Sequence, residues 1–80
     1  MEYLDGQEVL VGDKLIADRS DGVVVYVIDT KQSSKEHPAG TWDYLEKGMM
    51  VETVEMGLVH YPETDEDVIL IERAEPYHTS

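Results

Sequence analysis

Hydrophobic residues along this chain mostly alternate with polar ones or form short continuous runs, and they rarely follow the period of an α-helix. The clearest run covers residues 23–28, VVVYVI, in which every residue except Tyr26 is β-branched. Branching at Cβ suits a pleated strand and disfavours a helix. Because the run does not alternate, we expect a strand that is covered on both faces.

Shorter runs separated by turn residues predict the remaining strands. The pair Asp5-Gly6 favours a tight hairpin turn, because glycine readily adopts positive φ, and it joins predicted strands over residues 1–4 and 7–11. Gly57 serves the same purpose in a second predicted hairpin. The remaining strands are expected over residues 14–17, 49–54, 58–61 and 68–71.

Residues 41–48 predict a short helix of one or two turns. Thr41 is a suitable N-cap, and Gly48 suits a left-handed stop at the other end. A helix this short is not stable alone. We therefore expect Trp42 or Leu45 to dock it on the sheet.

Five or six short strands joined by tight turns predict a mainly β domain over residues 1–74, with residues 75–80 as a loose tail. The expected architecture is a small five- to six-stranded antiparallel barrel of the Src-homology-3 kind, with one short helix. The alternative is an open antiparallel sheet with one helix packed on it.

The composition restricts the partners that such a domain can bind. The chain has 80 residues, with 18 Asp and Glu against 6 Lys and Arg, so its formal net charge is −12. Nucleic acids and anionic membranes attract cationic side chains, so neither is expected as a partner. No apolar run approaches the roughly 20 residues of a membrane span, and the acidic start is unlike a secretory signal. The chain has no cysteine, and we expect a cytoplasmic protein.

The sequence lacks the residue patterns of common catalytic sites. No serine stands in a nucleophile-elbow pattern that a histidine would activate, and no glycine-rich loop for a phosphate is present. Glu52 lies within a predicted strand, and if buried there it would have a raised pKa and act as an acid or base. The solvent face of an edge strand is the commoner position for such a residue. We therefore expect no enzymatic activity and no cofactor.

Four acidic residues, Glu63, Asp65, Glu66 and Asp67, stand within five positions. Carboxylate oxygens are the ligands that hard cations prefer, but this segment lacks the central glycine and terminal glutamate of an EF-hand loop. We expect a solvated acidic loop and no metal site, with weak binding of a divalent cation as the alternative.

Aromatic residues near these acids predict a surface for a basic protein partner. The chain has one Trp and five Tyr but no Phe, and both residues combine a flat apolar ring with a polar tip that suits interfaces. The alternative is that Trp42 closes one end of the barrel and Tyr26 belongs to the core. The predicted partner-binding surface comprises Trp42, Tyr44, Glu46, Tyr61, Glu63, Asp65, Glu66 and Asp67.

Three segments carry a resemblance to a known group of proteins. They are YLDG at residues 3–6 with the Gly-Asp pair at 12–13, the hairpin from GMMVET to GLVHY at 48–61, and DEDVILI at 65–71. In these segments the chain resembles a group of small, acidic, uncharacterised proteobacterial proteins. The resemblance implies a bacterial protein with a compact β fold and suggests a link to toxin–immunity systems. It transfers no catalytic residues.

These features lead to two hypotheses for the function. The first is a cytoplasmic, acidic protein-binding module that acts as an immunity-type inhibitor of a basic toxin. The second is a regulatory or homodimeric interaction module with no toxin partner, which would use exposed strand edges and Met49, Met50 and Met56.

The large negative charge gives a first testable prediction. Repulsion between the carboxylates opposes compaction, so the melting temperature is expected to rise as salt is added from low to moderate concentration. Thermal unfolding followed by circular dichroism measures this effect. A melting temperature that falls steadily over the same range would contradict it.

Overall fold

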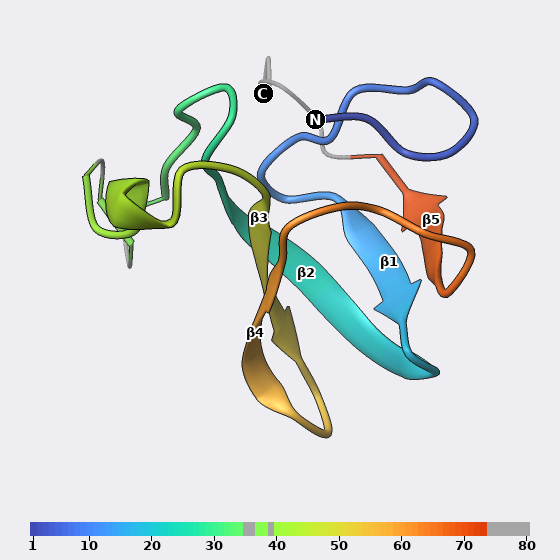
Figure 1. Cartoon of the computed structure of the whole chain (residues 1–80). Helices are drawn as coiled ribbons and strands as arrows, with labels where there is room; N and C mark the ends of the chain where they lie inside the picture. Colours follow the sequence, from blue (N-terminus) through green and yellow to red (C-terminus); the bar gives the residue numbers. More distant parts are fainter. Residues whose placement is uncertain (35–36, 39, 74–80) are drawn as a thin grey trace, which may run out of the picture.

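The computed structural model describes residues 1–34, 37–38 and 40–73, and these residues build one five-stranded antiparallel sheet (Figure 1). The strand order across the sheet is β4-β3-β2-β1-β5. The predicted tail at 75–80 lies outside the described residues. The strands are β1 (Lys14–Ala17), β2 (Ser20–Val27), β3 (Met49–Thr53), β4 (Gly57–Tyr61) and β5 (Val68–Glu72).

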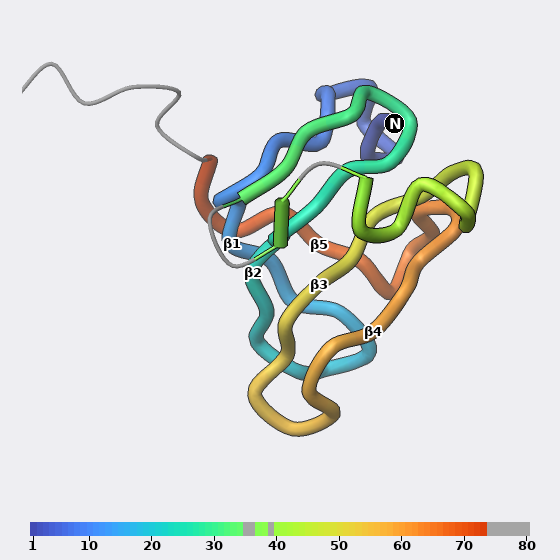
Figure 2. Tube along the Cα trace, turned by 90° about the vertical axis from the view of Figure 1, so that its left-hand side faces the viewer, coloured from blue at the N-terminus to red at the C-terminus, as the bar shows by residue number. Residues whose placement is uncertain are grey.

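The mainly β class is confirmed, but the sheet is not closed into a barrel, so the predicted closure is wrong. Within the described residues β4 and β5 form the two edges and do not pair with each other. The N-terminal segment supplies core side chains instead, because Tyr3 and Val9 belong to the same buried cluster as Tyr61 of β4 and Val68 of β5. In two perpendicular views the N-terminal segment lies at one end of the sheet, and the β3–β4 turn lies at the other (Figures 1 and 2).

The Asp5-Gly6 turn forms as predicted, but the strands expected on either side of it do not. The Gly6 amide donates to the Tyr3 carbonyl oxygen at 2.9 Å, and the Tyr3 amide donates to the Gln7 carbonyl oxygen at 2.8 Å. Beyond this turn the two segments share one isolated bridge, between Glu2 and Glu8. The N-terminal segment is therefore a tight loop that contributes side chains to the core.

The two halves of β2 differ in how many of their faces are covered. In the first half the exposed Asp21 and Val23 alternate with buried residues, so one face is open to solvent. The register with β3 then shifts between Val24 and Tyr26, and Tyr26, Val27 and Ile28 are all buried. The continuous hydrophobic run therefore has coverage on both faces only at its C-terminal end.

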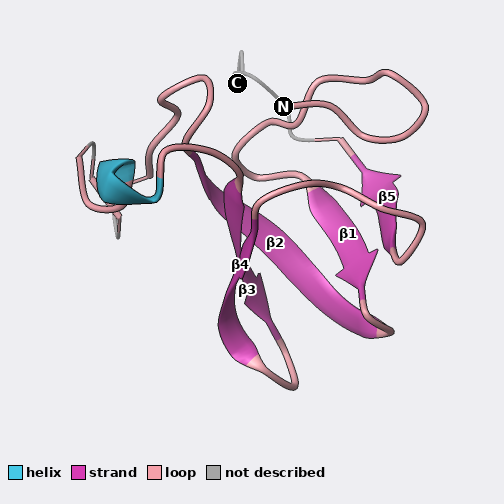
Figure 3. Cartoon of the chain, viewed as in Figure 1, coloured by secondary structure: helices cyan, strands magenta, loops and turns pink. Residues whose placement is uncertain are grey.

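Residues 41–48 cover the second face of β2 at its C-terminal end. They form a 3-10 turn where we predicted a helix. The turn, η1, comprises Asp43–Leu45, and no α-helix is present among the described residues (Figure 3). Thr41 does not cap it, because its hydroxyl donates to the Pro38 carbonyl oxygen at 2.6 Å. As expected, Trp42 and Leu45 pack on the sheet, against a cluster that contains Tyr26.

Gly48 follows η1 with a φ of +105°, but it is not the predicted stop, because the turn ends at Leu45 and the left-handed residue that caps it is Glu46, with a φ of +71°. The Gly48 amide donates to the Asp29 carboxylate. A Cβ at Gly48 would lie 2.5 Å from the Tyr61 carbonyl oxygen and 2.7 Å from Pro62 Cα. Both atoms are backbone atoms that have little freedom to move away.

Gly48→Ala is expected to lower the free energy of unfolding by about 2–4 kcal/mol, because it combines left-handed strain with a backbone clash. Gly6→Ala is the matched control, since Gly6 has a φ of +93° but no atom within 4 Å of the added Cβ. Gly6→Ala should lower the free energy of unfolding by about 1–2 kcal/mol, because it introduces the left-handed strain without a clash. Urea unfolding of the two variants measures the difference, and equal losses would contradict the clash.

Candidate functional site

The predicted partner-binding residues around η1 are placed in different environments. Trp42 is half-buried, with its ring edge-on to Tyr26 at a centroid distance of 5.2 Å and an interplanar angle of 88°. The side chain of Tyr44, by contrast, is 75% exposed, and Glu46 is exposed beside it in the chain. Trp42 therefore serves mainly to dock the segment, and Tyr44 with Glu46 remains available to a partner.

Tyr26 also holds the η1 segment through its hydroxyl. The hydroxyl donates to Asp43 Oδ1 at 2.9 Å and accepts from the Gly40 amide at 2.8 Å. The ring itself is buried in the sheet. Trp42 and Tyr26 thus play the packing roles that the sequence left as the alternative, although there is no barrel end for Trp42 to close.

The remaining predicted residues are Tyr61, the last residue of β4, and the four acids on the connection between β4 and β5. Tyr61 is only 9% exposed, and its hydroxyl donates to Asp18 Oδ2 at 2.7 Å. Desolvation by burial, together with the hydrogen bond and charge of Asp18, raises the pKa of Tyr61. The four acidic residues that follow, Glu63, Asp65, Glu66 and Asp67, are exposed.

The structure does not bring the predicted residues around η1 and those of the β4–β5 connection into one continuous patch. The Asp67 carbonyl oxygen accepts from the Asp18 amide at 3.1 Å, so the end of the acidic loop lies at the turn before β2. Tyr26, which packs against η1, lies near the opposite end of β2. A strand rises about 3.3 Å per residue, so Tyr26 is about 20 Å from the turn before β2. Glu63, the first acid of the loop, lines a shallow depression together with Lys47, which follows η1 in the chain. The prediction therefore corresponds to two acidic surfaces.

The described residues contain no group of three or more His, Asp or Glu side chains that could hold a metal ion. In the acidic loop, Asp65 Oδ1 instead accepts a hydrogen bond from the Asp67 amide at 2.9 Å. Glu52 is exposed on β3, which is an interior strand and not the edge strand that we expected. It therefore lacks the burial on which its role as an acid or base depended.

Sequence reasoning missed a groove on the solvent-facing side of the sheet. Its volume is about 590 Å³, and it extends over β1, β2, β3 and the end of β5. We call this feature the outer-face groove and define it by Lys14, Asp21, Val23, Glu52, Val54 and Ile71. Its signal in the sequence is the alternation in Asp21-Gly22-Val23 and Glu52-Thr53-Val54, where acids and valines share one face.

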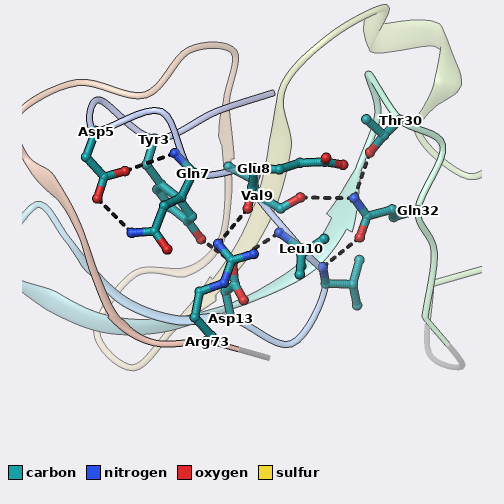
Figure 4. A network of polar contacts seen from close by, with 11 residues as sticks. Tyr3, Asp5, Gln7, Glu8, Val9, Leu10, Asp13, Thr30, Gln32 and Arg73 are labelled. Carbon is teal, nitrogen blue, oxygen red and sulfur yellow. Dashed lines mark hydrogen bonds and ion pairs between the residues drawn. The ribbon is translucent and has the colours of Figure 1, made fainter. Parts of the chain in front are cut away.

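A separate polar network fixes the N-terminal segment to the sheet (Figure 4). Asp13 is fully buried, and its Oδ2 accepts from the Tyr3 hydroxyl at 2.7 Å and from the Leu10 amide at 3.0 Å. Arg73 lies 3.8 Å from the same oxygen and donates to the Glu8 carbonyl oxygen at 2.7 Å. The network joins both ends of the described chain, so its role is structural.

Gln32 holds the other side of the N-terminal segment. Its side-chain amide donates to the Val9 carbonyl oxygen at 2.9 Å, and its Oε1 accepts from the Val11 amide at 2.9 Å. Since both backbone contacts are those that a neighbouring strand would make, Gln32 substitutes for sheet pairing along this segment (Figure 4).

No protein-family model, curated protein or solved structure matches the chain. The resemblance to small acidic proteobacterial proteins and its link to toxin–immunity systems therefore stay predictions. Among the described residues, no helix is long and apolar enough to cross a membrane.

The Tyr3–Asp13 contact makes stability depend on pH in the alkaline range. Burial, the hydrogen bond to Asp13 and its negative charge raise the pKa of Tyr3. Tyrosine in the unfolded chain ionises near pH 10, so above that pH the unfolded chain loses a proton that the folded chain keeps. The contribution of Tyr3 is therefore complete below pH 10 and is lost as the pH rises.

We expect Tyr3 to reduce the free energy of unfolding by about 1.4 kcal/mol per pH unit above about pH 10. In Tyr3→Phe the free energy of unfolding should lose this part of its dependence on pH. General charge repulsion and the ionisation of Tyr61 affect the wild type and the variant alike. Urea unfolding at a series of alkaline pH values measures the two slopes. Identical slopes for the wild type and Tyr3→Phe would show that Tyr3 ionises at the same pH in the folded and the unfolded chain.

Proposed function

We propose that this protein is a small, acidic, cytoplasmic protein-binding module that acts as an immunity-type inhibitor of a basic toxin. The observation that carries the proposal is the net charge of −12 on 80 residues. A field of this sign and size attracts positively charged proteins and repels nucleic acids and anionic membranes.

The distribution of charge within the fold supports a cationic partner. Two of the basic side chains are already paired with carboxylates, since Lys14 Nζ lies 3.8 Å from Glu72 and Arg73 lies 3.8 Å from Asp13. The acidic side chains of the β4–β5 connection are exposed and have no ion pair among the described residues. The negative field is therefore not cancelled at this surface.

The same features support a mechanism of inhibition. Proteins that cleave or modify nucleic acids bind the phosphate backbone through basic faces. An acidic module is steered towards such a face, and complementary charges raise the association rate more than they raise the final affinity. Exposed Tyr44 offers a flat anchor next to Glu46. A module docked on the basic face would exclude the nucleic-acid substrate by occupying its binding surface.

We also infer that the sheet is a Src-homology-3-like arrangement that lacks the final closure. Strands β2, β3 and β4 form a meander, and β1 pairs with both β2 and β5. Small sheets of this kind commonly present grooves to peptide segments of other proteins. This inference supports protein binding as the general class of activity.

A second candidate is a regulatory or homodimeric interaction module without a toxin partner. Exposed aliphatic side chains on both edge strands favour it, with Leu58 on β4 and Ile69 on β5 at 41% and 53% exposure. Of the methionines that we considered for this role, Met49 and Met50 are buried in the core. Only Met56 of these three is exposed, at 46%.

Co-expression with toxic products of neighbouring genes tests the leading proposal. The expected result is restored growth and co-purification with one basic toxin. Neutralising two exposed acids by Glu63→Gln and Glu66→Gln should lower the association rate about tenfold at low ionic strength, and added salt should reduce this difference. Stopped-flow or surface-binding kinetics measures the rates.

The matched control is the pair Glu8→Gln and Glu55→Gln, which removes the same charge from two other exposed positions. Its association rate should stay closer to that of the wild type. If no neighbouring toxin is neutralised or co-purified, or if association is independent of salt, the proposal is wrong.

A further inference from the structure

The outer-face groove has a regular pattern of side chains that follows from the strand register. Val23 of β2 lies opposite Glu52 of β3, and the Val54 amide donates to the Asp21 carbonyl oxygen at 2.9 Å. Each valine therefore lies opposite a carboxylate, and the two valines stand on one diagonal while the two acids stand on the other. Directly opposite side chains are about 5 Å apart and diagonal ones about 7–8 Å.

The apolar side chains that line the outer-face groove are open to solvent. Val23, Val54 and Ile71 are 37%, 81% and 60% exposed. The groove volume of about 590 Å³ lies within the range of about 300–1,000 Å³ that is typical of ligand-binding clefts. Exposed aliphatic side chains around such a cleft are typical of a surface that a partner covers.

The charge of the groove is negative. Asp21 and Glu52 are exposed carboxylates on its lining. Lys14 is the basic residue of the lining, and Glu72 neutralises it at 3.8 Å. An occupant that covered the valines with apolar groups alone would desolvate two carboxylates without a compensating charge, which is costly.

We propose that the outer-face groove binds a segment of the basic partner in which apolar and Lys or Arg side chains alternate on one face. In an extended segment, residues i and i+2 lie on the same face about 6.6–7 Å apart, which matches the spacing between a valine and the acid two residues away on the same segment, Val23 with Asp21 or Val54 with Glu52. The apolar side chain covers the valines, and the cationic one reaches Glu52 or Asp21. This proposal rests on the proposed function, because it takes the partner to be basic.

A second copy of this chain is a poorer occupant than a cationic segment. A symmetric dimer places the same patch of both copies face to face. The groove would then bring Asp21 and Glu52 towards their own counterparts, on two chains that each carry a charge of −12. Like-charge contacts of this kind disfavour association.

The probe is a fluorescein-labelled peptide with the sequence VSRSVSR, in which valine and arginine alternate on one face of an extended chain. One control peptide replaces arginine by glutamate, and another replaces valine by serine. Fluorescence anisotropy gives the dissociation constants, and amide chemical shifts in ¹⁵N-labelled protein locate the binding surface. We expect the probe to bind, with shifts concentrated on β2, β3 and the β3–β4 turn, and each control peptide to bind at least about fivefold more weakly.

Two substitutions in the groove have matched controls elsewhere on the surface. Glu52→Gln and Val54→Ser should each weaken probe binding about fivefold or more. Glu8→Gln removes the same charge from the exposed surface of the N-terminal segment, and Leu4→Ser removes an aliphatic side chain that is 68% exposed. Both controls should change binding by less than about twofold, and urea midpoints verify that all four variants fold.

Three outcomes would overturn the proposal. The first is equal binding of VSRSVSR and its glutamate counterpart, or no binding of either. The second is an equal effect of Glu52→Gln and Glu8→Gln, which would indicate diffuse attraction without a specific groove. The third is a wild-type dimer in sedimentation that Val54→Ser dissociates, because the occupant would then be a second copy.

The proposed function and the groove can fail separately. If a neighbouring toxin is neutralised but Glu52→Gln and Val54→Ser leave its affinity unchanged, the partner docks elsewhere and only the groove is wrong. If the groove variants weaken probe binding but no toxin is neutralised, the groove stands and the immunity function is wrong.

Discussion

The change in coverage along β2 is the constraint on which the rest of the structure depends. At its C-terminal end, Tyr26 and Ile28 point away from the main core, and burying them requires a second layer. The η1 segment supplies that layer through Trp42 and Leu45. At the N-terminal end none of the described segments covers the second face, so Val23 is exposed and the outer-face groove is formed. One strand therefore sets both the position of η1 and the place where the sheet is open.

Electrostatics imposes the second constraint. A chain with a charge of −12 must keep nearly all its carboxylates in water, because an unpaired buried charge is very costly. Among the described residues Asp13 is the exception, and its buried carboxylate is surrounded by partners that include the Tyr3 hydroxyl, the Leu10 amide and Arg73. These contacts stabilise the N-terminal segment, which contributes Tyr3 and Val9 to the core. The open sheet thus completes its core with a loop that a single buried carboxylate holds in place.

Local sequence signals were sufficient where neighbouring residues determine the structure. The turns at Gly6 and Gly57 and the strands β3, β4 and β5 follow from alternation and turn chemistry. The helix expected at residues 41–48 failed because other contacts replace its cap. The Thr41 hydroxyl bonds the Pro38 carbonyl oxygen just before the segment, and the Tyr26 hydroxyl, from the distant strand β2, engages Asp43. The outer-face groove was missed because a continuous hydrophobic run does not reveal which of its residues another segment covers. Tyr61 was assigned to a surface because its partner Asp18 is 43 residues away in the sequence.

The charge and the open apolar face are physically linked. Edge strands with exposed aliphatic side chains, such as β5 with Ile69 and Ile71, invite edge-to-edge association. Carboxylates interspersed among them make such contacts between identical chains repulsive, as Asp21 and Glu52 do beside the two valines. The same carboxylates would attract a segment of opposite charge, so in the proposed complex they discriminate between a second copy and a basic partner. A small sheet can therefore leave part of its apolar surface uncovered and still remain selective about what covers it.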